Sequence, residues 1–337
     1  MFLVRPAKID DVDTLLKLAR TVHFVNLPPD KDVIAGKVLR SRKSFNGEYD
    51  HDERQRLFMF CMEDTDTGNL IGSSMIVSSV SWPGHPHTYL KVRRREFYSE
   101  DLQGGQVHLT LEFETDETGP SELGGLILAP GYRGHAQKLG KTLSMIRFHF
   151  IGLQPHQFNE RMLAEMMGRI TPDSNNLLWD YLGRRFINLS YKEADLFCQR
   201  SKEFMTSLFP SGEIYASLLP PEARNLIAKV GDETKPARAM LEKQGFCYEG
   251  DIDPFDGGPY LEALRDEIPL VRATGRYALM GSEGGFDQVG IVSFWGESGF
   301  RATRCEFRID GDQVILPGEV VDALETSVGA MIGVTPL

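Results

Sequence analysis

The stretch LGGLILAPGYRGHAQKLGKTLSMIRFHF (123–150) decides the fold. Its first seven residues, 123–129, predict a strand, because they are mainly apolar and follow the polar run ETDETGPSE. After a loop, residues 139–150 predict a long apolar helix. A strand that feeds a helix through a loop is a place where phosphate-bearing ligands bind, because the first N–H groups of the helix and its dipole favour an anion.

The loop itself carries a short motif. Residues Gln137 to Thr142 fit the pattern Gln/Arg-x-x-Gly-x-small, which resembles the loop by which GNAT-type acyltransferases hold the pyrophosphate of coenzyme A (CoA). Gly140 lets the backbone approach phosphates closely, whereas Thr142 stands where Gly or Ala is usual. The same residues also suit an ordinary helix N-terminus. A Walker-type loop is excluded, although GKT occurs at 140–142, because His135 stands where its first glycine is required.

Two adjacent glycines, Gly124 and Gly125, interrupt the strand before this loop. Glycine inside a strand is typical of a β-bulge, where one extra residue leaves backbone groups without a ladder partner. The sequence therefore predicts a bulge here, whose free backbone groups would pair with the pantetheine arm of CoA.

The rest of the chain is predicted outward from this centre by apolar periodicity and turn residues. The first part predicts a strand at 2–5, helices at 9–20 and 30–45, a hairpin of 57–64 and 70–80, and extended stretches around 88–95 and 107–113. The part after the central helix predicts a strand at 161–170, helices at 175–186, 192–209, 221–230 and 235–244, and extended structure with a turn at 245–263. From about residue 266 the chain predicts short β-like runs, at 289–296, 300–309 and 313–321 among others. We therefore expect a main domain, 1–265, and a β-rich C-terminal subdomain, 266–337.

Composition narrows the class of protein. A net charge of −11 over 337 residues argues against nucleic-acid binding and suits a cationic substrate. No apolar run reaches the roughly 20 residues that a membrane span needs, and the start lacks the pattern of an export signal. Four single cysteines without CxxC spacing predict reduced thiols rather than disulfides or a metal site. We expect a cytoplasmic enzyme without a metal.

Beyond the loop, several stretches carry a family likeness: 4–19, 27–28, 58–72, 121–130, 164–170, 177–198, 214–230, 236–246, 252–263 and 312–324. Together and in this order they resemble the bacterial arginine N-succinyltransferase family, and FDGGP (255–259) after PARAMLEKQGF (236–246) is the most specific part. The resemblance covers nearly the whole chain.

This resemblance implies an α+β fold of the GNAT-like acyl-CoA N-acyltransferase type with the added β-rich subdomain. It implies transfer of succinyl from succinyl-CoA to the α-amino group of arginine or ornithine by direct attack, with the CoA thioester as co-substrate and no separate cofactor. It also implies small-molecule partners and a homo- or hetero-oligomer, with no nucleic acid and no membrane. The implied CoA-binding residues are Leu126, Leu128, Gln137, Gly140, Lys141 and Thr142.

Two departures from the family pattern affect the acceptor site. The family has a catalytic histidine directly after the valine that corresponds to Val230, but this chain has Gly231. The stretch FVNLPPD (24–30) replaces a Gly-rich loop of the family. Asp232 and Glu233 are the neighbouring candidates for the base, if burial or a neighbouring acid raises the pKa of either carboxyl. Both also suit a solvated helix start.

Other residues are candidates for the base or for the acceptor. His108 and His135 are the histidines nearest to the CoA strand and loop in the sequence. Glu165, Asp253 and Asp256 are candidates to pair with a guanidinium or amine, and Arg238 or Arg184 to hold a carboxylate. Asp256 also suits a tight turn in which it bonds the glycines of FDGGP. A second function therefore stays open: a catalytically silent homologue that binds CoA or arginine as a sensor, or as a subunit of a hetero-oligomer.

Overall fold

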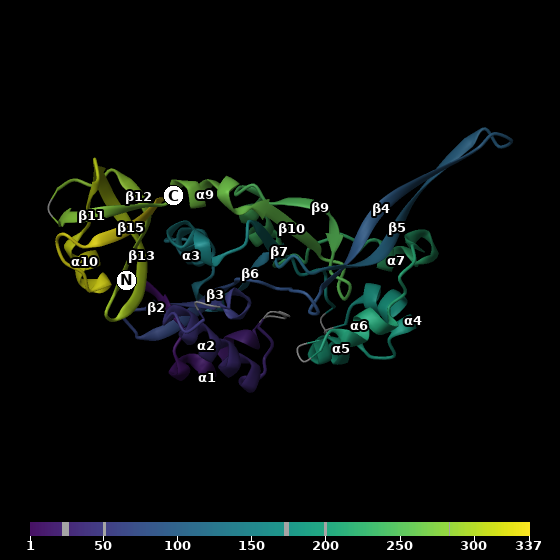
Figure 1. Ribbon diagram of the computed structural model, residues 1–337, viewed down its shortest axis with the longest axis horizontal. Helices are drawn as coiled ribbons and strands as arrows, with labels where there is room; N and C mark the ends of the chain where they lie inside the picture. The colour runs from purple at the N-terminus through teal and green to yellow at the C-terminus, as the bar shows by residue number, and fades with distance from the viewer. Residues whose placement is uncertain (22–26, 50–51, 172–174, 199–200, 283) are drawn as a thin grey trace. The chain divides into compact units, whose positions relative to one another are not determined.

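The computed structural model describes residues 1–337 except 22–26, 50–51, 172–174, 199–200 and 283 (Figure 1). The chain forms two compact units. The first unit contains residues 1–79, 120–162 and 263–337, and the second contains 80–119 and 163–262. The C-terminal residues 266–337 thus belong to the same compact unit as the N-terminus, and the domain boundary near 265 stays a prediction.

Four antiparallel strands form the centre of the first unit, in the order β1-β2-β3-β6. Their bounds are β1 (Phe2–Pro6), β2 (Leu57–Asp64), β3 (Asn69–Val77) and β6 (Ser121–Leu128). Helices α1 (Val12–Ala19) and α2 (Lys31–Phe45) lie on one side of β2 and β3, and α3 (Leu139–Leu153) lies on the other (Figure 1). These elements confirm the predicted opening and the central strand and helix.

Local chemistry fixes the helices to this sheet. The Asp30 side chain accepts hydrogen bonds from the N–H groups of Asp32 and Val33 and so begins α2. On the face of the sheet covered by α3, the ring of Phe150 lies 4.9 Å from that of Phe58 and 5.2 Å from that of Phe60, both on β2. These buried rings form an aromatic core between α3 and the sheet.

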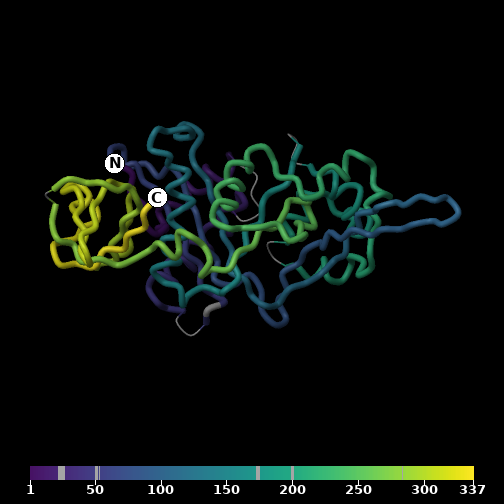
Figure 2. The backbone as a smooth tube through the Cα atoms, turned by 90° about the horizontal axis from the view of Figure 1, so that it is seen from above, coloured from purple at the N-terminus to yellow at the C-terminus, as the bar shows by residue number. Residues whose placement is uncertain are grey.

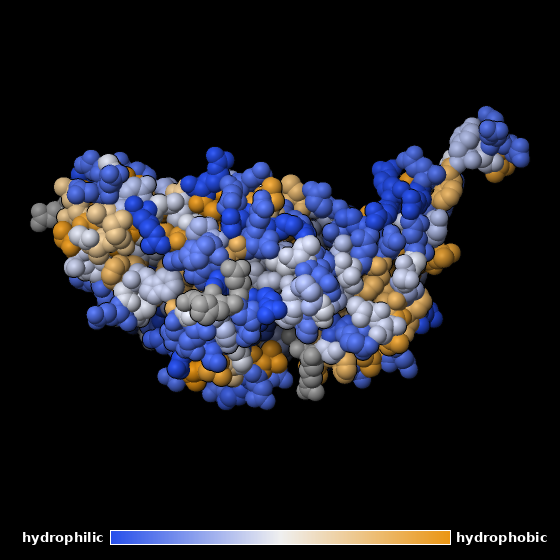
Figure 3. Space-filling view, viewed as in Figure 1, coloured by the Kyte–Doolittle hydropathy of each residue, from blue (hydrophilic) through white to orange (hydrophobic). Residues whose placement is uncertain are grey.

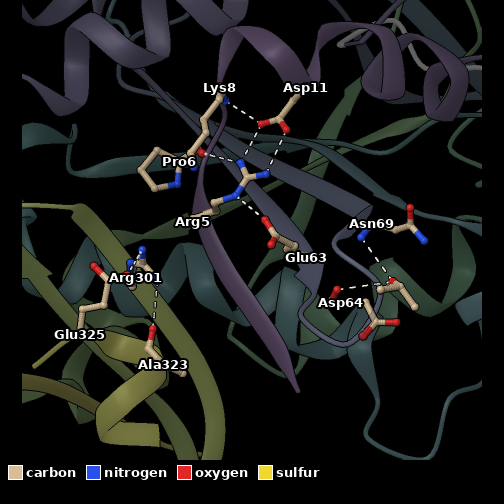
Figure 4. A network of polar contacts seen from close by, with 11 residues as sticks. Arg5, Pro6, Lys8, Asp11, Glu63, Asp64, Asn69, Arg301, Ala323 and Glu325 are labelled. Atoms are coloured by element: carbon tan, nitrogen blue, oxygen red, sulfur yellow. Dashed lines mark hydrogen bonds and ion pairs between the residues drawn. The ribbon is translucent and has the colours of Figure 1, made fainter.

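A charged network ties the start of the chain to β2 (Figure 4). The guanidinium of Arg5 donates to both carboxylate oxygens of Asp11, at 2.7 and 3.0 Å, and its Nε donates to Glu63 at 2.8 Å. Asp11 also accepts the N–H of Lys8 at 2.7 Å. A largely buried, forked pair of this kind holds β1, the following turn and β2 in one arrangement.

The C-terminal strands close into a ring within the first unit. The strands are β11 (Gly275–Gly281), β12 (Gln288–Gly296), β13 (Gly299–Asp310), β14 (Gln313–Ile315) and β15 (Met331–Pro336). They pair in the order β12-β15-β11-β14-β13, and β13 pairs again with β12. β13 also pairs with β1, so the ring continues the central sheet. A closed ring leaves no free strand edge among its own members.

One prediction in this region is wrong. The stretch 313–321 was expected to be extended throughout, but β14 ends at Ile315 and α10 (Gly318–Leu324) begins after Pro317. Proline lacks the N–H that a strand ladder needs and its fixed φ suits a helix start, so the strand gives way to a helix here. A second short helix, α9 (Pro269–Ala273), precedes the ring.

The second unit has its own sheet, in the order β10-β9-β4-β5-β8. The unit contains β4 (His87–Ser99), β5 (Gly104–Asp116), β8 (Ile214–Tyr215) and β9 (Cys247–Ile252). It also contains most of β10 (Pro259–Leu264) and of β7 (Arg161–Glu165), which is the neighbour of β10. β4 and β5 form a long hairpin whose far end extends beyond the rest of this unit (Figures 1 and 2). That end exposes polar and apolar side chains together, including Leu102 at 83% (Figure 3).

Helices cover this second sheet. They are a π-helical turn (Trp179–Gly183), α4 (Arg184–Phe186), α5 (Tyr191–Cys198), α6 (Glu203–Leu208), α7 (Pro221–Arg224) and α8 (Lys235–Glu242). Fully buried Trp179 stacks on Phe255 at 4.9 Å in the centre of their core. Single 3-10 turns complete the chain, at Ile9–Asp11, Glu53–Gln55, Pro130–Tyr132, Pro155–Gln157, Ala216–Leu218 and Arg265–Glu267. Within the described ranges, no helix is both long and apolar enough to span a membrane.

His149 joins α3 to the C-terminal ring and makes stability depend on pH. Its ring nitrogens lie 2.6 Å from the hydroxyl of Thr335 and 2.7 Å from that of Ser293, and the side chain is fully buried. Burial, with a smaller contribution from the positive charge of Arg276, lowers the pKa of His149 to about 3. The unfolded chain takes up a proton below its ordinary pKa of about 6.5, but the folded chain does not.

We therefore expect stability to fall as the pH drops from 6.5 to 5, with His149 contributing about 2 kcal/mol of that loss. Urea unfolding at both pH values measures it. His149→Gln should be less stable than the wild type at pH 7 but should lose less on acidification. Exposed His156→Gln should keep the wild-type dependence; parallel curves for wild type and His149→Gln would contradict the assignment.

Candidate active site

The predicted β-bulge is confirmed in β6. Ser73 pairs with Ile127 and Met75 pairs with Gly124, so three steps along β6 face two along β3. Gly125 takes φ of +58°, and its carbonyl accepts a hydrogen bond from the Ser73 hydroxyl at 3.1 Å. The extra residue displaces the backbone from the regular ladder, which is how a strand offers backbone groups to a ligand.

The loop after β6 is held by its own contacts. Lys138 has a left-handed φ of +54°, and α3 begins at the next residue with no side chain capping its first N–H groups. Arg304 on β13 donates to the carbonyl of Gln137 at 2.7 Å. Gln137 and Lys141 are exposed, and both belong to the predicted CoA-binding set. An uncapped helix start with exposed polar and basic side chains suits a phosphate group.

Thr142 and His135 differ in what they offer this loop. The hydroxyl of Thr142 is buried and has no hydrogen-bond partner among the residues that the structure describes. His135 accepts the N–H of Gln137 at Nδ1, at 3.2 Å, and its ring packs edge-on against Phe2 at 5.1 Å. His135 therefore stabilises the loop. Because its Nδ1 already accepts a hydrogen bond, it is a weaker candidate for the base. Leu126, Leu128 and Gly140 are partly exposed along the same path.

In the second unit, the FDGGP stretch forms a turn stabilised by two carboxylates. Asp253 accepts the N–H groups of Phe255 and Asp256 at 2.7 and 2.9 Å. Asp256 accepts the N–H of Gly258 at 2.7 Å and that of Gly168 at 2.8 Å. A Cβ on Gly258 would lie 1.9 Å from a backbone carbonyl, so only glycine fits there. The turn interpretation of Asp256 is confirmed.

The same turn gathers negative charge inside the unit. Burial raises the pKa of Asp253, and burial together with Asp253 raises the pKa of Asp256 well above its ordinary value. Burial, then the charge of Asp253, raises the pKa of Asp195 on α5 to about 6. Glu165, at the end of β7, belongs to the same electrostatic neighbourhood, since it acts with Asp253 on the thiol of Cys198. A bound cation would relieve this repulsion.

One histidine lies beside these acids. The Nε2 atom of buried His87, on β4, lies 3.6 Å from a carboxylate oxygen of Glu165. The His87 ring also packs at 5.2 Å on the ring of Tyr260, whose hydroxyl donates to Asp253 at 3.1 Å. His87 therefore contacts Glu165 directly and is linked to Asp253 through Tyr260, and Glu165 and Asp253 were both among the predicted candidates.

The position of the absent histidine is closed by backbone. The N–H of Gly231 donates to the carbonyl of Met167 at 3.0 Å, and Val230 forms a β-bridge with Gly168. A Cβ at Gly231 would lie 2.9 Å from the Gly168 carbonyl oxygen, closer than side chains approach backbone. Any side chain at this position requires the backbone to move.

The neighbouring acids are not buried. Asp232 is exposed and forms an ion pair with Lys235 at 2.6 Å, and this hydrogen bond lowers the pKa of Asp232. The expectation that burial would raise the pKa is therefore wrong for Asp232. Glu233 is exposed as well. Both lie just before α8, where they suit a solvated helix start; their catalytic role stays a prediction without a burial argument behind it.

The remaining candidates lie in other contacts. Arg238 donates to Glu242 one turn along α8, at 2.7 Å, and Arg184 lies 3.8 Å from Asp180. His108, on the hairpin, lies 3.1 Å from the Ser217 hydroxyl. The first part of 24–30, residues 24–26, lies outside the described residues.

Sequence reasoning missed His87 and Asp195. Asp195 carried a signal, because Tyr191, Asp195 and Cys198 follow helical spacing and share one face of α5, the face near Asp253. His87 carried none, since its contacts join strands that are far apart in the sequence. All four cysteines are free, and the described part of the chain has no group of three or more potential ligands arranged to hold a metal.

Comparisons with known proteins identify the family and the fold. The family model described as arginine N-succinyltransferase beta subunit matches residues 2–270. Arginine N-succinyltransferase of Citrobacter koseri is 33% identical over 337 aligned residues, covering 98% of this chain and 96% of that protein. Its namesake from Shigella boydii is 34% identical over 275 residues, covering 81% and 78%.

The fold comparison covers the complete chain. The solved structure of arginine/ornithine succinyltransferase subunit AI from Pseudomonas aeruginosa superposes with a TM-score of 0.86 at 24% identity, covering 100% of this chain and 98% of that one. The predicted α+β fold is confirmed. From the match over residues 2–270 and the full-length relatives, the chain belongs to the arginine N-succinyltransferase family.

Proposed function

We propose that this chain transfers the succinyl group of succinyl-CoA to the α-amino group of arginine or ornithine. Family membership and the names of its relatives support the reaction. The observation that carries it in this chain is the set of acids around the FDGGP turn, which suits a cationic amino acid. The CoA thioester is a co-substrate, and the proposal needs no further cofactor. A cytoplasmic location and an oligomeric assembly stay predictions.

We propose that the amino-acid acceptor is bound through its positive charge. A guanidinium or side-chain ammonium pairs with Asp195 and Asp253. In its absence, burial raises the pKa of both, and the charge of Asp253 adds to the rise at Asp195. Binding of a cation then lowers both pKa values and releases protons. The affinity for arginine depends on how much of this charge is present before binding.

The donor side uses the bulge and the loop of the first unit. The pantetheine arm pairs with backbone groups freed at Gly125 and Leu126, and the pyrophosphate lies at the start of α3, near Gln137, Gly140 and Lys141. The buried hydroxyl of Thr142 adds a donor at the same helix start. No covalent enzyme intermediate is required.

The amine must lose a proton before it attacks the thioester. The nitrogen lone pair forms a bond to the carbonyl carbon, the carbon–sulfur bond breaks, and CoA leaves as a thiolate that takes up a proton. In this chain, we propose that His87 accepts the proton of the α-ammonium, because it is the imidazole beside the acids and Glu165 holds it by charge. His87 thus replaces the imidazole that is absent at position 231.

The reaction is tested by CoA release from purified protein with succinyl-CoA and arginine, ornithine, lysine or no amine. We expect turnover with arginine or ornithine and little without amine, because the acid cluster selects the acceptor. Mass spectrometry of the product identifies the acylated nitrogen. CoA binding without turnover of any pair would instead favour the catalytically silent homologue.

Asp195 should make acceptor binding depend on pH. With a pKa of about 6, its carboxylate gains charge as the pH rises from 5 to 7, so the dissociation constant of arginine should fall over this range. In Asp195→Asn, we expect arginine to bind about 10-fold more weakly at pH 7, with a flatter pH dependence, by calorimetry without acyl-CoA. Glu222→Gln, an exposed acid on α7, is the control. Unchanged affinity in Asp195→Asn would remove Asp195 from the acceptor site.

His87→Gln should lower kcat about 10²–10⁴-fold near pH 7.5, the usual contribution of a general base. The deficit should shrink above pH 9, because the amine then loses its proton to solvent without help. His85→Gln, an exposed histidine two residues away that stacks on Trp82, is the matched control. A loss that is equal at every pH would show a structural role for His87 instead.

A further inference from the structure

A buried cation on α3 has no acid beside it. The side chain of Arg147 is only 3% exposed. Its guanidinium donates to the carbonyl of Ser144 at 3.1 Å and to the Ser144 hydroxyl at 2.9 Å, and no described carboxylate forms an ion pair with it. Burial lowers the pKa of Arg147 to about 10, which leaves it charged at neutral pH. An uncompensated buried charge is costly to a fold, so its presence calls for a partner.

The packing of α3 shows which strands lie along its inner face. A Cβ built on Gly72 of β3 would lie 2.6 Å from the Leu143 side chain, and one on Gly140 would lie 3.7 Å from the Leu128 side chain on β6. Two turns beyond Leu143, Phe150 packs on rings of β2. Around the helix, the direction toward β2 is therefore marked by Phe150, that toward β3 by Leu143, and that toward β6 by Gly140.

The direction of Arg147 follows from helical geometry. At about 100° per residue, Arg147 lies about 40° from Leu143, on the side of Gly140 and away from Phe150. The Cα–Cβ bond of Arg147 therefore points toward β3 and β6. Along the helix axis it lies about 6 Å beyond Leu143.

The strands at this level carry the bulge and a buried hydroxyl. Two residues along β3 from Gly72 are about 6.6 Å, so Ser74 lies at the level of Arg147. Ser74 pairs with Phe60, so its side chain points to the α3 face, and its buried hydroxyl has no hydrogen-bond partner in the described part of the chain. On β6, the residues opposite Ser74 are Gly125 and Leu126 of the bulge.

We propose that Arg147, with the Ser74 hydroxyl, binds the terminal carboxylate of a dicarboxylic acyl group and so selects succinyl-CoA over CoA esters of uncharged acids. This inference rests on the proposed function, because it requires the thioester to lie at the bulge of β6. The guanidinium fork matches a carboxylate in two parallel hydrogen bonds, and the ligand supplies the negative charge that the protein does not. An acetyl or butyryl group leaves the cation unpaired.

Butyryl-CoA is the sharpest probe, because it has the chain length of succinyl-CoA with a methyl in place of the carboxylate. We expect the wild type to prefer succinyl-CoA over butyryl-CoA in kcat/KM by 100-fold or more, as a site built around a buried polar group rejects an analogue that leaves it unpaired. In Arg147→Met, the preference should fall to about 10-fold or less, mainly through loss of activity with succinyl-CoA. Arg147→Lys should keep part of the preference, because it retains charge without the fork.

Two further variants separate selectivity from stability. Ser74→Ala should lower the preference about threefold to tenfold without removing a charge, since it deletes one hydrogen bond. Arg56→Met removes another buried arginine of the first unit, whose Nε donates to the Tyr49 carbonyl, and should keep the wild-type preference even if it lowers stability. An unchanged preference in Arg147→Met would overturn the inference.

Binding alone keeps this test apart from the proposed function. Dissociation constants of succinyl-CoA and butyryl-CoA, measured by calorimetry without an amine, should show the same loss of preference in Arg147→Met. If the wild type turned over neither thioester with arginine or ornithine, the proposed function would fail, and the ratio of these constants would decide the role of Arg147. Equal binding of both thioesters by the wild type would overturn it.

Discussion

The carboxylate of Asp256 holds together the turn around which we propose that the acceptor binds. It accepts backbone hydrogen bonds from Gly258, within its own turn, and from Gly168, in the segment that follows β7. That segment in turn forms the bridge to Val230 and accepts the N–H of Gly231. A single buried acid thus joins three stretches distant in sequence, and the close approach leaves room only for glycine at 258. Asp253 belongs to the same turn, and Glu165 and His87 lie beside it.

The same contacts explain why the family histidine cannot simply be restored. At Gly231 the space that a Cβ would need is taken by a backbone oxygen. A histidine at position 231 would have to displace the bridge between Gly168 and Val230. The proposed base, His87, lies on β4 of the same unit and needs no such displacement.

Sequence alone predicted what depends on local pattern. Apolar periodicity located the central strand and α3, and adjacent glycines located the bulge, since both signals come from neighbouring residues. Prediction from sequence failed where contacts between distant residues determine the site. His87 contacts Glu165 only after β4 and β7 are assembled, and the exposure of Asp232 follows from how α8 begins. The strand predicted through 321 ended early because Pro317 interrupts it, a local signal that the apolar run outweighed. Sequence reasoning named Glu165, Asp253 and Asp256 as candidates, but their electrostatic influence on one another required the fold.

The C-terminal ring also affects the loop between β6 and α3. Its strand β13 pairs with β1 and carries Arg304, which donates to the carbonyl of Gln137 in the loop that we propose binds the pyrophosphate. The match to the family model ends at residue 270, before any strand of this ring. A chain shortened to that length would expose the outer edge of β1 to pairing with other chains and would free the loop from Arg304. The C-terminal ring therefore supports the loop before α3 and shields an edge of the central sheet, so it is not a detachable appendage.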